Sequence, residues 1–361
     1  MDQAELEALK LRKPLSAIFD ELGYKSRGDK RVRWCLCPWH LEHSASCRID
    51  DFKGFAYCFG CGESGDAIDI VMYARGVSFM HAVEMLGGLK PLTSGERWEW
   101  QERRKRIEQD EAEQREAMRK RLNKAWAACQ PIQGTWAEAY LGARGLRPSP
   151  DWTFDLRFSM LSYRGFPDAE ASQTVNYGEF PALVAAIRSQ GELIGLHRTY
   201  LDANQPKKLE PPGDQRNKPK KILGEAKNGL IWLSKPCARI VVGEGIETTR
   251  SWLLLHAEKE PETGACSGVS LGNIAGRSVG TEPHPTNSRL RIPNGIPDLE
   301  YAAIKYPDEV KEIMFLGDGD SDYAMTSKRL MCALRRAQAQ GKTAFRHFAP
   351  EGMDFNDVLR T

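Results

Sequence analysis

The chain has 361 residues, which is enough for two or three domains that each bury a hydrophobic core. Its 51 basic and 49 acidic side chains leave a net charge of +2, so overall charge identifies no class of partner. The nine cysteines are odd in number and follow a charged N-terminus without an apolar signal segment, which argues against a disulfide-stapled secreted protein and predicts a cytoplasmic one. No segment is long and apolar enough to span a membrane, so we expect no membrane partner.

Residues 1–90 are predicted to form a compact module of short helices and of small strands around the cysteines. Apolar residues recur at helical spacing over residues 66–74 and again over 78–86, and Ser78 is placed to cap the second helix. Glycines and a proline follow within residues 87–91 and end that helix.

Four residues in this module have the spacing of a zinc site: Cys37, His40, Cys58 and Cys61. They form two pairs, each separated by two residues, with seventeen residues between the pairs, which suits a closed tetrahedral site on a hairpin. Reduced cysteines are also common as small core residues, but two ordered pairs favour zinc. Cys35 is a competing ligand.

Aromatic and basic side chains surround the zinc pattern. Alternating rings and cations suit single-stranded nucleic acid, since stacking contributes roughly 1–3 kcal/mol per base. Some of the rings must instead form the small core of the module. We therefore expect nucleic-acid contact from basic residues first, among them Arg48 and Lys53.

Residues 91–130 are predicted to form a charged helical connector. The sequence from Ser94 to Ala128 is rich in Glu, Arg, Lys and Gln, with opposite charges often three or four residues apart. The run of four basic residues at 103–106 is compatible with a nucleic-acid contact or with a solvated helix face, and we favour the solvated face.

Extended and helical segments alternate after residue 131. Strands are predicted over 180–189, 193–200 and 229–233, with a Pro- and Lys-rich loop over 206–221. The segment from Arg188 to Arg239 contains eleven basic residues and five acidic ones. Several are candidates to hold phosphate groups, although each is also compatible with a solvated position: Arg198, Lys207, Lys208, Lys220 and Lys221.

Two acidic clusters follow predicted buried parallel strands over 239–242 and 312–316. Glu244 comes after the first strand, and Asp318, Asp320 and Asp322 come after the second. Open α/β sheets place their active sites at the carboxyl ends of such strands. Converging carboxylates suit Mg²⁺ or Mn²⁺, although an aspartate-rich turn is the structural alternative.

Helices are expected over 247–257 and 323–340, after these two strands. Asp354, further along the chain, is a second-tier ligand candidate. The sequence assigns no role to an insertion over residues 277–306.

Two sets of motifs resemble known families. Residues 30–86 resemble the zinc-binding domain of DnaG-type and phage primases, through Cys37-Pro-Trp-His40-x-Glu42-x-Ser44-x-Ser46 and Tyr57-Cys58-Phe59-Gly60-Cys61-Gly62-x-x-Gly65-Asp66-Ala67-Ile68. A departure is Cys47, where the family usually has Phe.

Most of residues 135–361 resemble phage and plasmid Toprim primases. The matching motifs are Tyr140-Leu-Gly-Ala-Arg144-Gly-Leu, Leu196-His197-Arg198-Thr199-Tyr200-Leu201, Val-Val-Gly-Glu244-Gly, Asp318-Gly-Asp320 and Gly352-Met-Asp354-Phe-Asn356-Asp357. The resemblance implies an α/β multi-domain chain: an N-terminal zinc ribbon with helices, the helical connector, the N-terminal part of an RNA polymerase core over 131–235, and a Toprim-type α/β catalytic domain over 236–361.

The implied function is that of a DNA primase, which makes short RNA primers from NTPs on single-stranded DNA by metal-dependent nucleotidyl transfer. One structural zinc ion and catalytic Mg²⁺ or Mn²⁺ are the expected cofactors, with Glu244 either binding metal or transferring a proton. No P-loop is present, so any replicative helicase is expected to act in trans, which suggests a phage or plasmid origin. The alternatives are a Toprim-type nuclease and a non-catalytic single-stranded-DNA-binding replication adaptor.

Overall fold

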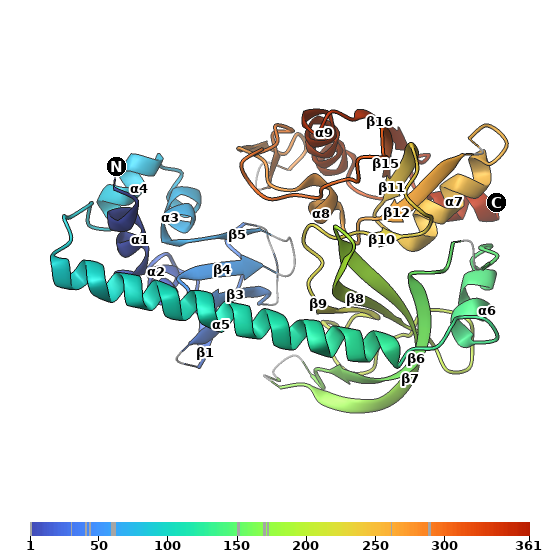
Figure 1. The fold of residues 1–361 in the computed structure, drawn as a ribbon, viewed down its shortest axis with the longest axis horizontal. Coiled ribbons are helices and arrows are strands. Elements are labelled where there is room, and N and C mark those ends of the chain that lie inside the picture. Colours follow the sequence, from blue (N-terminus) through green and yellow to red (C-terminus); the bar gives the residue numbers. More distant parts are fainter. Residues whose placement is uncertain are drawn as a thin grey trace. The chain divides into compact units, whose positions relative to one another are not determined.

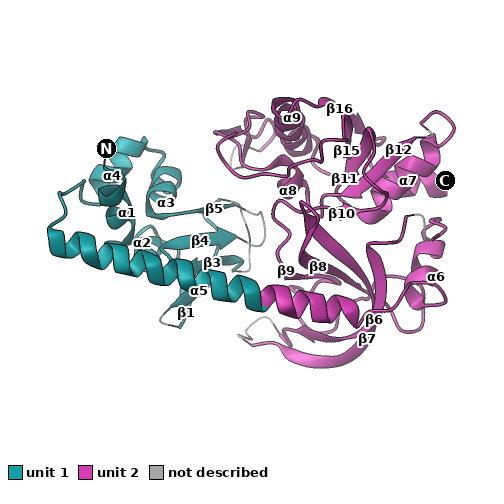
Figure 2. Cartoon of the chain, viewed as in Figure 1, with its two compact units in different colours: residues 1–117 teal, residues 118–361 magenta. Residues whose placement is uncertain are grey.

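The computed structural model describes residues 2–29, 31–39, 42, 45–58, 63–149, 152–168, 171, 173–260, 262–287 and 290–361. The chain forms two compact units, residues 1–117 and 118–361 (Figure 2). Helix α5 (Ser94–Ala127) begins in the first unit and ends in the second. Within the described ranges, no helix has both the length and the apolar character that crossing a membrane requires.

The first unit packs four short helices on a small antiparallel sheet. The strands lie in chain order, β1 (Arg27–Gly28), β2 (Val32–Cys35), β3 (Cys47–Asp50), β4 (Phe55–Cys58) and β5 (Ser64–Gly65). One sheet face, which includes Ile49 and Ala56, forms a core with α1 (Gln3–Leu11), α2 (Leu15–Glu21), α3 (Ala67–Arg75) and α4 (Phe79–Met85).

Local capping explains where α3 and α4 begin, and both predicted helices are confirmed. Asp66 caps α3 and forms a reciprocal capping box with Asp69. Ser78 accepts a hydrogen bond from the His81 amide at the start of α4, as the sequence indicated.

The predicted connector helix is confirmed as α5, and within the first unit it is attached by side chains rather than merely exposed. Arg31 pairs with Asp110 at 2.8 Å, and Lys53 pairs with Glu111 at 2.9 Å. Arg103 donates to main-chain carbonyl oxygens of the β3–β4 turn. Within the basic run, Arg104 and Lys105 pair with glutamates on the same helix. The pairs of Arg104 and Lys105 support the solvated-face interpretation for these two residues, whereas Arg103 contacts the β3–β4 turn.

The second unit begins with the end of α5 and helix α6 (Trp136–Ala143), which pack around an antiparallel sheet. Its strands, in order, are β6 (Leu156–Gly165), β7 (Val175–Ser189), β8 (Glu192–Tyr200) and β9 (Lys220–Gly224). The predicted loop over 206–221 is wrong at its end, because Lys220 and Lys221 pair with Thr199 and Arg198 across the β8–β9 ladder.

A second sheet contains the acidic clusters. Its strand order is β10 (Ile231–Trp232), β12 (Thr263–Ser267), β11 (Arg239–Gly243), β15 (Glu312–Gly317) and β16 (Thr343–Phe348), and all but β10 run parallel. Helices α7 (Ile246–His256), α8 (Leu271–Ala275), α9 (Tyr323–Ala339) and α10 (Phe355–Arg360) accompany it (Figure 1). A short hairpin, β13 (Thr281–Pro283) and β14 (Arg291–Pro293), lies in the insertion.

This sheet is covered on both faces, which explains why its strands read as continuous apolar runs. Val241 and Leu316 belong to the core that includes α6, α7 and α10. Val242 and Phe315, the next positions in the pleat, belong to the core that includes α8 and α9. The predicted α/β multi-domain fold class is thereby confirmed, and the layers are consistent with a Toprim-like core.

Candidate active site and metal centre

The two acidic clusters meet at one edge of the parallel sheet. Strands β11 and β15 are neighbours, with Val242 opposite Phe315. Glu244 follows β11 and Asp318 follows β15, so both leave the sheet at its carboxyl edge. The strand order, and not the chain distance between these residues, brings the carboxylates together.

The Asp318-Gly-Asp320 turn is held by a second segment of the chain. The Gly319 amide donates to the carbonyl oxygen of Met353 at 2.8 Å, and the Gly352 amide donates to the carbonyl oxygen of Gly319 at 2.9 Å. A Cβ at position 319 would collide with the Pro350 carbonyl, so glycine is required there. This docking places Asp354, the N-cap of α10, beside the turn.

The carboxyl group of Asp318 has a strongly raised pKa. Burial, and the negative charges of Glu244, Asp354 and Asp320, raise its pKa to about 7. Its buried Oδ1 atom has no hydrogen-bond partner among the described residues. A buried carboxylate oxygen surrounded by like charges is what a divalent cation would neutralise, so the donor set fits Mg²⁺ or Mn²⁺.

Two cations border the carboxylates. Desolvation raises the pKa of Glu244, and the negative charge of Asp320 raises it further. Lys220 and Arg329 lower the pKa of Glu244. Lys220 also lowers the pKa of Asp318. Within the described ranges, no three His, Cys, Asp or Glu side chains are close enough to hold a metal ion as they stand. The carboxylates therefore converge without forming a closed cage.

Asp322, also expected as a metal ligand, has both oxygens engaged. Its Oδ1 accepts the Met325 amide at 2.7 Å and caps α9, and its Oδ2 lies 2.9 Å from Nε2 of His284. The capping bond and, more weakly, His284 lower the pKa of Asp322. Nothing in the sequence pattern indicated the contact with His284, which comes from the insertion.

A buried charge network that the sequence did not reveal lies next to Glu244. Glu247, which is 7% exposed, pairs with Lys208 at 3.1 Å and accepts a hydrogen bond from Tyr140. Burial alone would raise the pKa of Glu247, but Lys208 and Lys220 lower it far below its ordinary value. Burial lowers the pKa of the neighbouring His197 to about 4. Lys208 is thus bound to a protein carboxylate.

The other basic candidates are placed differently. Lys207 is exposed and pairs with Glu210 at 2.7 Å. Lys221 lies over the ring of Tyr163 and donates to a main-chain carbonyl oxygen. Arg198, half-buried on β8, has an Nε atom without a partner in the described part of the chain. Lys220 is the candidate that the electrostatics link most directly to the carboxylates.

The structure describes two of the four expected zinc ligands. Cys37 and Cys58 are buried at 5% and 0% exposure, whereas His40 and Cys61 lie outside the described residues. Glu42 accepts a hydrogen bond from the Cys37 amide at 2.7 Å.

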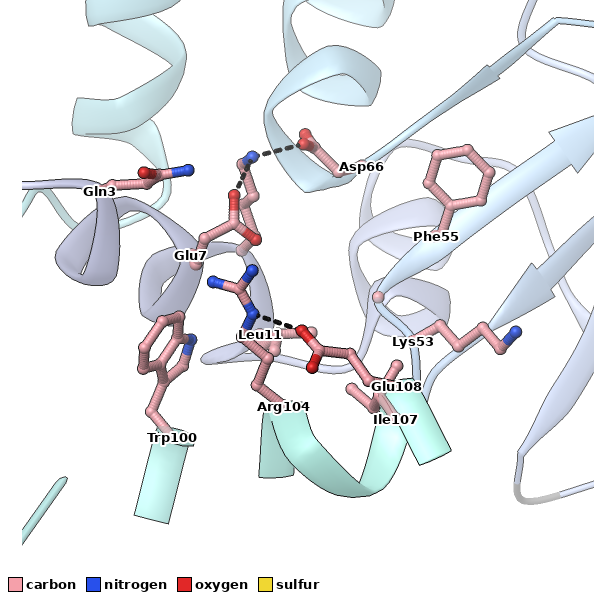
Figure 3. Close-up of a pocket in the computed structure, with 12 residues that line it drawn as sticks. Gln3, Glu7, Leu11, Lys53, Phe55, Asp66, Trp100, Arg104, Ile107 and Glu108 are labelled. Carbon is pink, nitrogen blue, oxygen red and sulfur yellow. Dashed lines mark hydrogen bonds and ion pairs between the residues drawn. The ribbon is translucent and has the colours of Figure 1, made fainter. Parts of the chain in front are cut away.

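The outward face of the small sheet carries the expected basic residue Arg48, between Trp34 and Tyr57 in register. Arg48 also contacts Asp50 at 3.1 Å. Lys53 lies at a pocket of about 410 Å³, which is lined by α1, the β3–β4 turn, Asp66 and α5 (Figure 3). Lys10, Lys53 and Arg104 in this pocket are already ion-paired, so they do not present free positive charge to a phosphate group.

Comparison with known proteins gives two family matches. Residues 2–96 match the family model described as CHC2 zinc finger, and residues 116–233 match that of a domain of unknown function, DUF7146. A DNA primase of Streptomyces coelicolor is 26% identical over 99% of this chain and 55% of that protein. A DNA primase of Helicobacter pylori is 54% identical over 14% of this chain and 9% of that protein.

This chain is a relative of the DnaG-type DNA primases. It spans about half the length of the Streptomyces primase and less of the Helicobacter primase. The match of residues 2–96 of this chain to the CHC2 zinc finger implies a structural zinc ion.

Two solved structures are also similar. The Aquifex aeolicus primase, zinc-binding and RNA polymerase domains, matches with a TM-score of 0.36 and 16% identity, over 100% of this chain and 82% of that one. A DNA primase domain from Pseudomonas aeruginosa matches with a TM-score of 0.37 and 16% identity, over 67% of this chain and 74% of that one. Both TM-scores are low, so neither match assigns a role to a residue of this chain.

Proposed function

We propose that this DnaG-type relative synthesises short RNA primers from NTPs on a single-stranded DNA template. The observation that carries the proposal is the convergence of Glu244 with Asp318 and Asp320 at the carboxyl ends of two adjacent parallel strands. That convergence occurs in a chain whose first 96 residues include a CHC2 zinc finger.

Glu244, Asp318 and Asp320 would hold Mg²⁺ or Mn²⁺, which when bound neutralises and orients the triphosphate. In the reaction, the 3′-hydroxyl of the growing primer attacks the α-phosphate of an NTP, and pyrophosphate leaves. Asp318 must lose its proton before it can bind a cation, because its pKa is raised to about 7. Asp354 is a further candidate ligand beside this turn.

Lys220 would bind the phosphates of the incoming nucleotide, since it lies close enough to lower the pKa of both Glu244 and Asp318. Arg198 is the second candidate, because it carries an unpartnered buried Nε on the neighbouring strand. Lys208 would act indirectly by neutralising Glu247.

The zinc finger would contact the template. Cys37, His40, Cys58 and Cys61 would bind one zinc ion, and Arg48, flanked by Trp34 and Tyr57, offers a cation between two aromatic rings. A replicative helicase acting in trans is the protein partner that we propose for such a primase.

The decisive experiment measures primer synthesis from labelled NTPs on varied single-stranded templates, with Mg²⁺ or Mn²⁺. Asp318→Ala should abolish the RNA product, whereas Asp308→Ala, at an exposed turn before β15, should retain it. No product on any template, with DNA binding intact, would instead identify a replication adaptor. Metal-dependent cutting of the template would identify a nuclease.

A further inference from the structure

The insertion over residues 277–306 is fastened along helix α9. Lys328 pairs with Glu282 of β13 at 2.7 Å, and Arg335 donates to the carbonyl oxygen of Gly295 at 2.8 Å. Arg336, only 5% exposed, donates to the carbonyl oxygens of Arg277 and, at 3.3 Å, of Tyr301. These contacts attach the insertion to the helix that follows the Asp318-Gly-Asp320 turn.

His284 is the residue of the insertion that reaches the acidic turn. His284 is 6% exposed, although much of the surrounding hairpin is exposed. The Thr286 amide lies 3.3 Å from Nδ1 and can only donate, so Nδ1 accepts. In the neutral ring the proton is therefore on Nε2, which donates to Oδ2 of Asp322 at 2.9 Å.

Asp322 connects this contact to the carboxylates of the acidic turn. It lies two residues after Asp320, and its other oxygen caps α9 through the Met325 amide. The turn is therefore held by two sets of hydrogen bonds. The Gly319 amide donates to the Met353 carbonyl oxygen, and the Asp322 carboxylate contacts both His284 and the first turn of α9. Between these two anchors, Asp320 is exposed at the sheet edge.

We propose that His284 is a positioning residue for the metal site. It keeps Asp322 in its capping role, away from the metal, and thereby fixes the direction in which Asp318 and Asp320 point. The proposal rests on the proposed function, because it takes this edge as the catalytic metal site. Hydrogen bonds behind metal ligands commonly set their orientation, and their loss weakens metal binding.

The test measures Mn²⁺ affinity of the full chain by electron paramagnetic resonance, with Asp318→Ala to identify the site. His284→Ala should raise the dissociation constant about tenfold, the lower end of the usual cost of losing an outer hydrogen bond. His284→Gln, whose amide nitrogen can take the place of Nε2, should stay close to the wild type. Lys328→Ala, which removes another contact between insertion and helix, should also stay close to the wild type.

A second variant guards against misfolding. Asp322→Ser keeps a side-chain oxygen that can cap α9 but removes the carboxylate that His284 contacts. It should therefore weaken Mn²⁺ binding as much as His284→Ala does. The double variant, with both substitutions, should bind Mn²⁺ no more weakly than either single variant. Three results would each overturn the proposal. They are an unchanged Mn²⁺ affinity in His284→Ala, an equal loss of Mn²⁺ affinity in Lys328→Ala, and a wild type without an Asp318-dependent Mn²⁺ site. If the wild type binds Mn²⁺ at this site but makes no primer, the proposed function fails and the role of His284 is still decided by affinity.

Discussion

Val242 of β11 and Phe315 of β15 are opposite one another in adjacent parallel strands. This register brings Glu244 and Asp318, two and three residues further along the chain, to the same edge of the sheet. Because both strands are buried on both faces, neither can shift without moving apolar side chains out of the core. The positions of Glu244 and Asp318 are therefore set by the buried strands β11 and β15.

The first prediction concerns stability and pH. A carboxyl group whose pKa rises from 3.8 to about 7 on folding lowers stability progressively as pH increases between those values, with the full cost above pH 7. Asp318→Asn mimics the protonated form. Without added Mg²⁺ or Mn²⁺, it should raise the free energy of unfolding by about 1–3 kcal/mol at pH 8.

Urea unfolding at pH 5, 6 and 8 would check this prediction, and the gain should shrink as the pH falls. Asp308→Asn, at an exposed turn, should leave stability nearly constant across the series. A gain for Asp318→Asn that is equal at pH 5 and pH 8 would show that the Asp318 carboxyl is not the cause.

The second prediction compares two adjacent lysines of β9. Lys220→Ala removes a cation that lowers the pKa of Glu244 and Asp318, so the KM for NTP should rise about tenfold, the loss expected for one charge-assisted hydrogen bond. Lys221→Ala should change KM little, because Lys221 contacts Tyr163 instead. Steady-state kinetics of primer synthesis would separate them, and an equal rise in both variants would exclude Lys220 as a specific phosphate contact.

The third prediction compares another neighbouring pair. Lys208→Ala leaves Glu247 buried without its ion-pair partner and should lower the free energy of unfolding by about 2–4 kcal/mol. Lys207→Ala removes only an exposed pair with Glu210 and should cost about 0.5 kcal/mol or less. Chemical denaturation at neutral pH measures both. Comparable losses would mean that the Lys208–Glu247 pair is solvated rather than buried.

The sequence predicted the acidic strands and their helices well because each has a strong local signal. Strand β15 ends one residue beyond the predicted Leu316, and α9 starts at the predicted Tyr323. Strand β12 was not predicted, because Gly264 and Ala265 have little intrinsic strand preference. Small residues are needed there, since a Cβ at position 264 would collide with Ser234 and Cys237.

The parts of the site that the sequence did not reveal depend on contacts between distant segments. Lys208 and Glu247 pair across 39 positions of the chain, and His284 reaches Asp322 from a hairpin with no strong periodicity. The local sequence around Lys220 predicts the continuation of a polar loop, but pairing with β8 makes these residues a strand. Local propensity carries no information about such pairings, which the tertiary fold decides.

The last prediction concerns zinc, for which Cys58 and Cys35 provide a matched comparison. Both are buried cysteines of the small sheet, at 0% and 1% exposure, but only Cys58 belongs to the expected ligand set. We expect one zinc ion per chain in the wild type and in Cys35→Ser, and loss of zinc in Cys58→Ser, measured by atomic absorption after dialysis. Because so small a module depends on its metal, Cys58→Ser should also unfold the first unit while α9 and the parallel sheet stay folded, which hydrogen exchange would detect. Zinc lost from Cys35→Ser and retained in Cys58→Ser would assign the site to Cys35 instead.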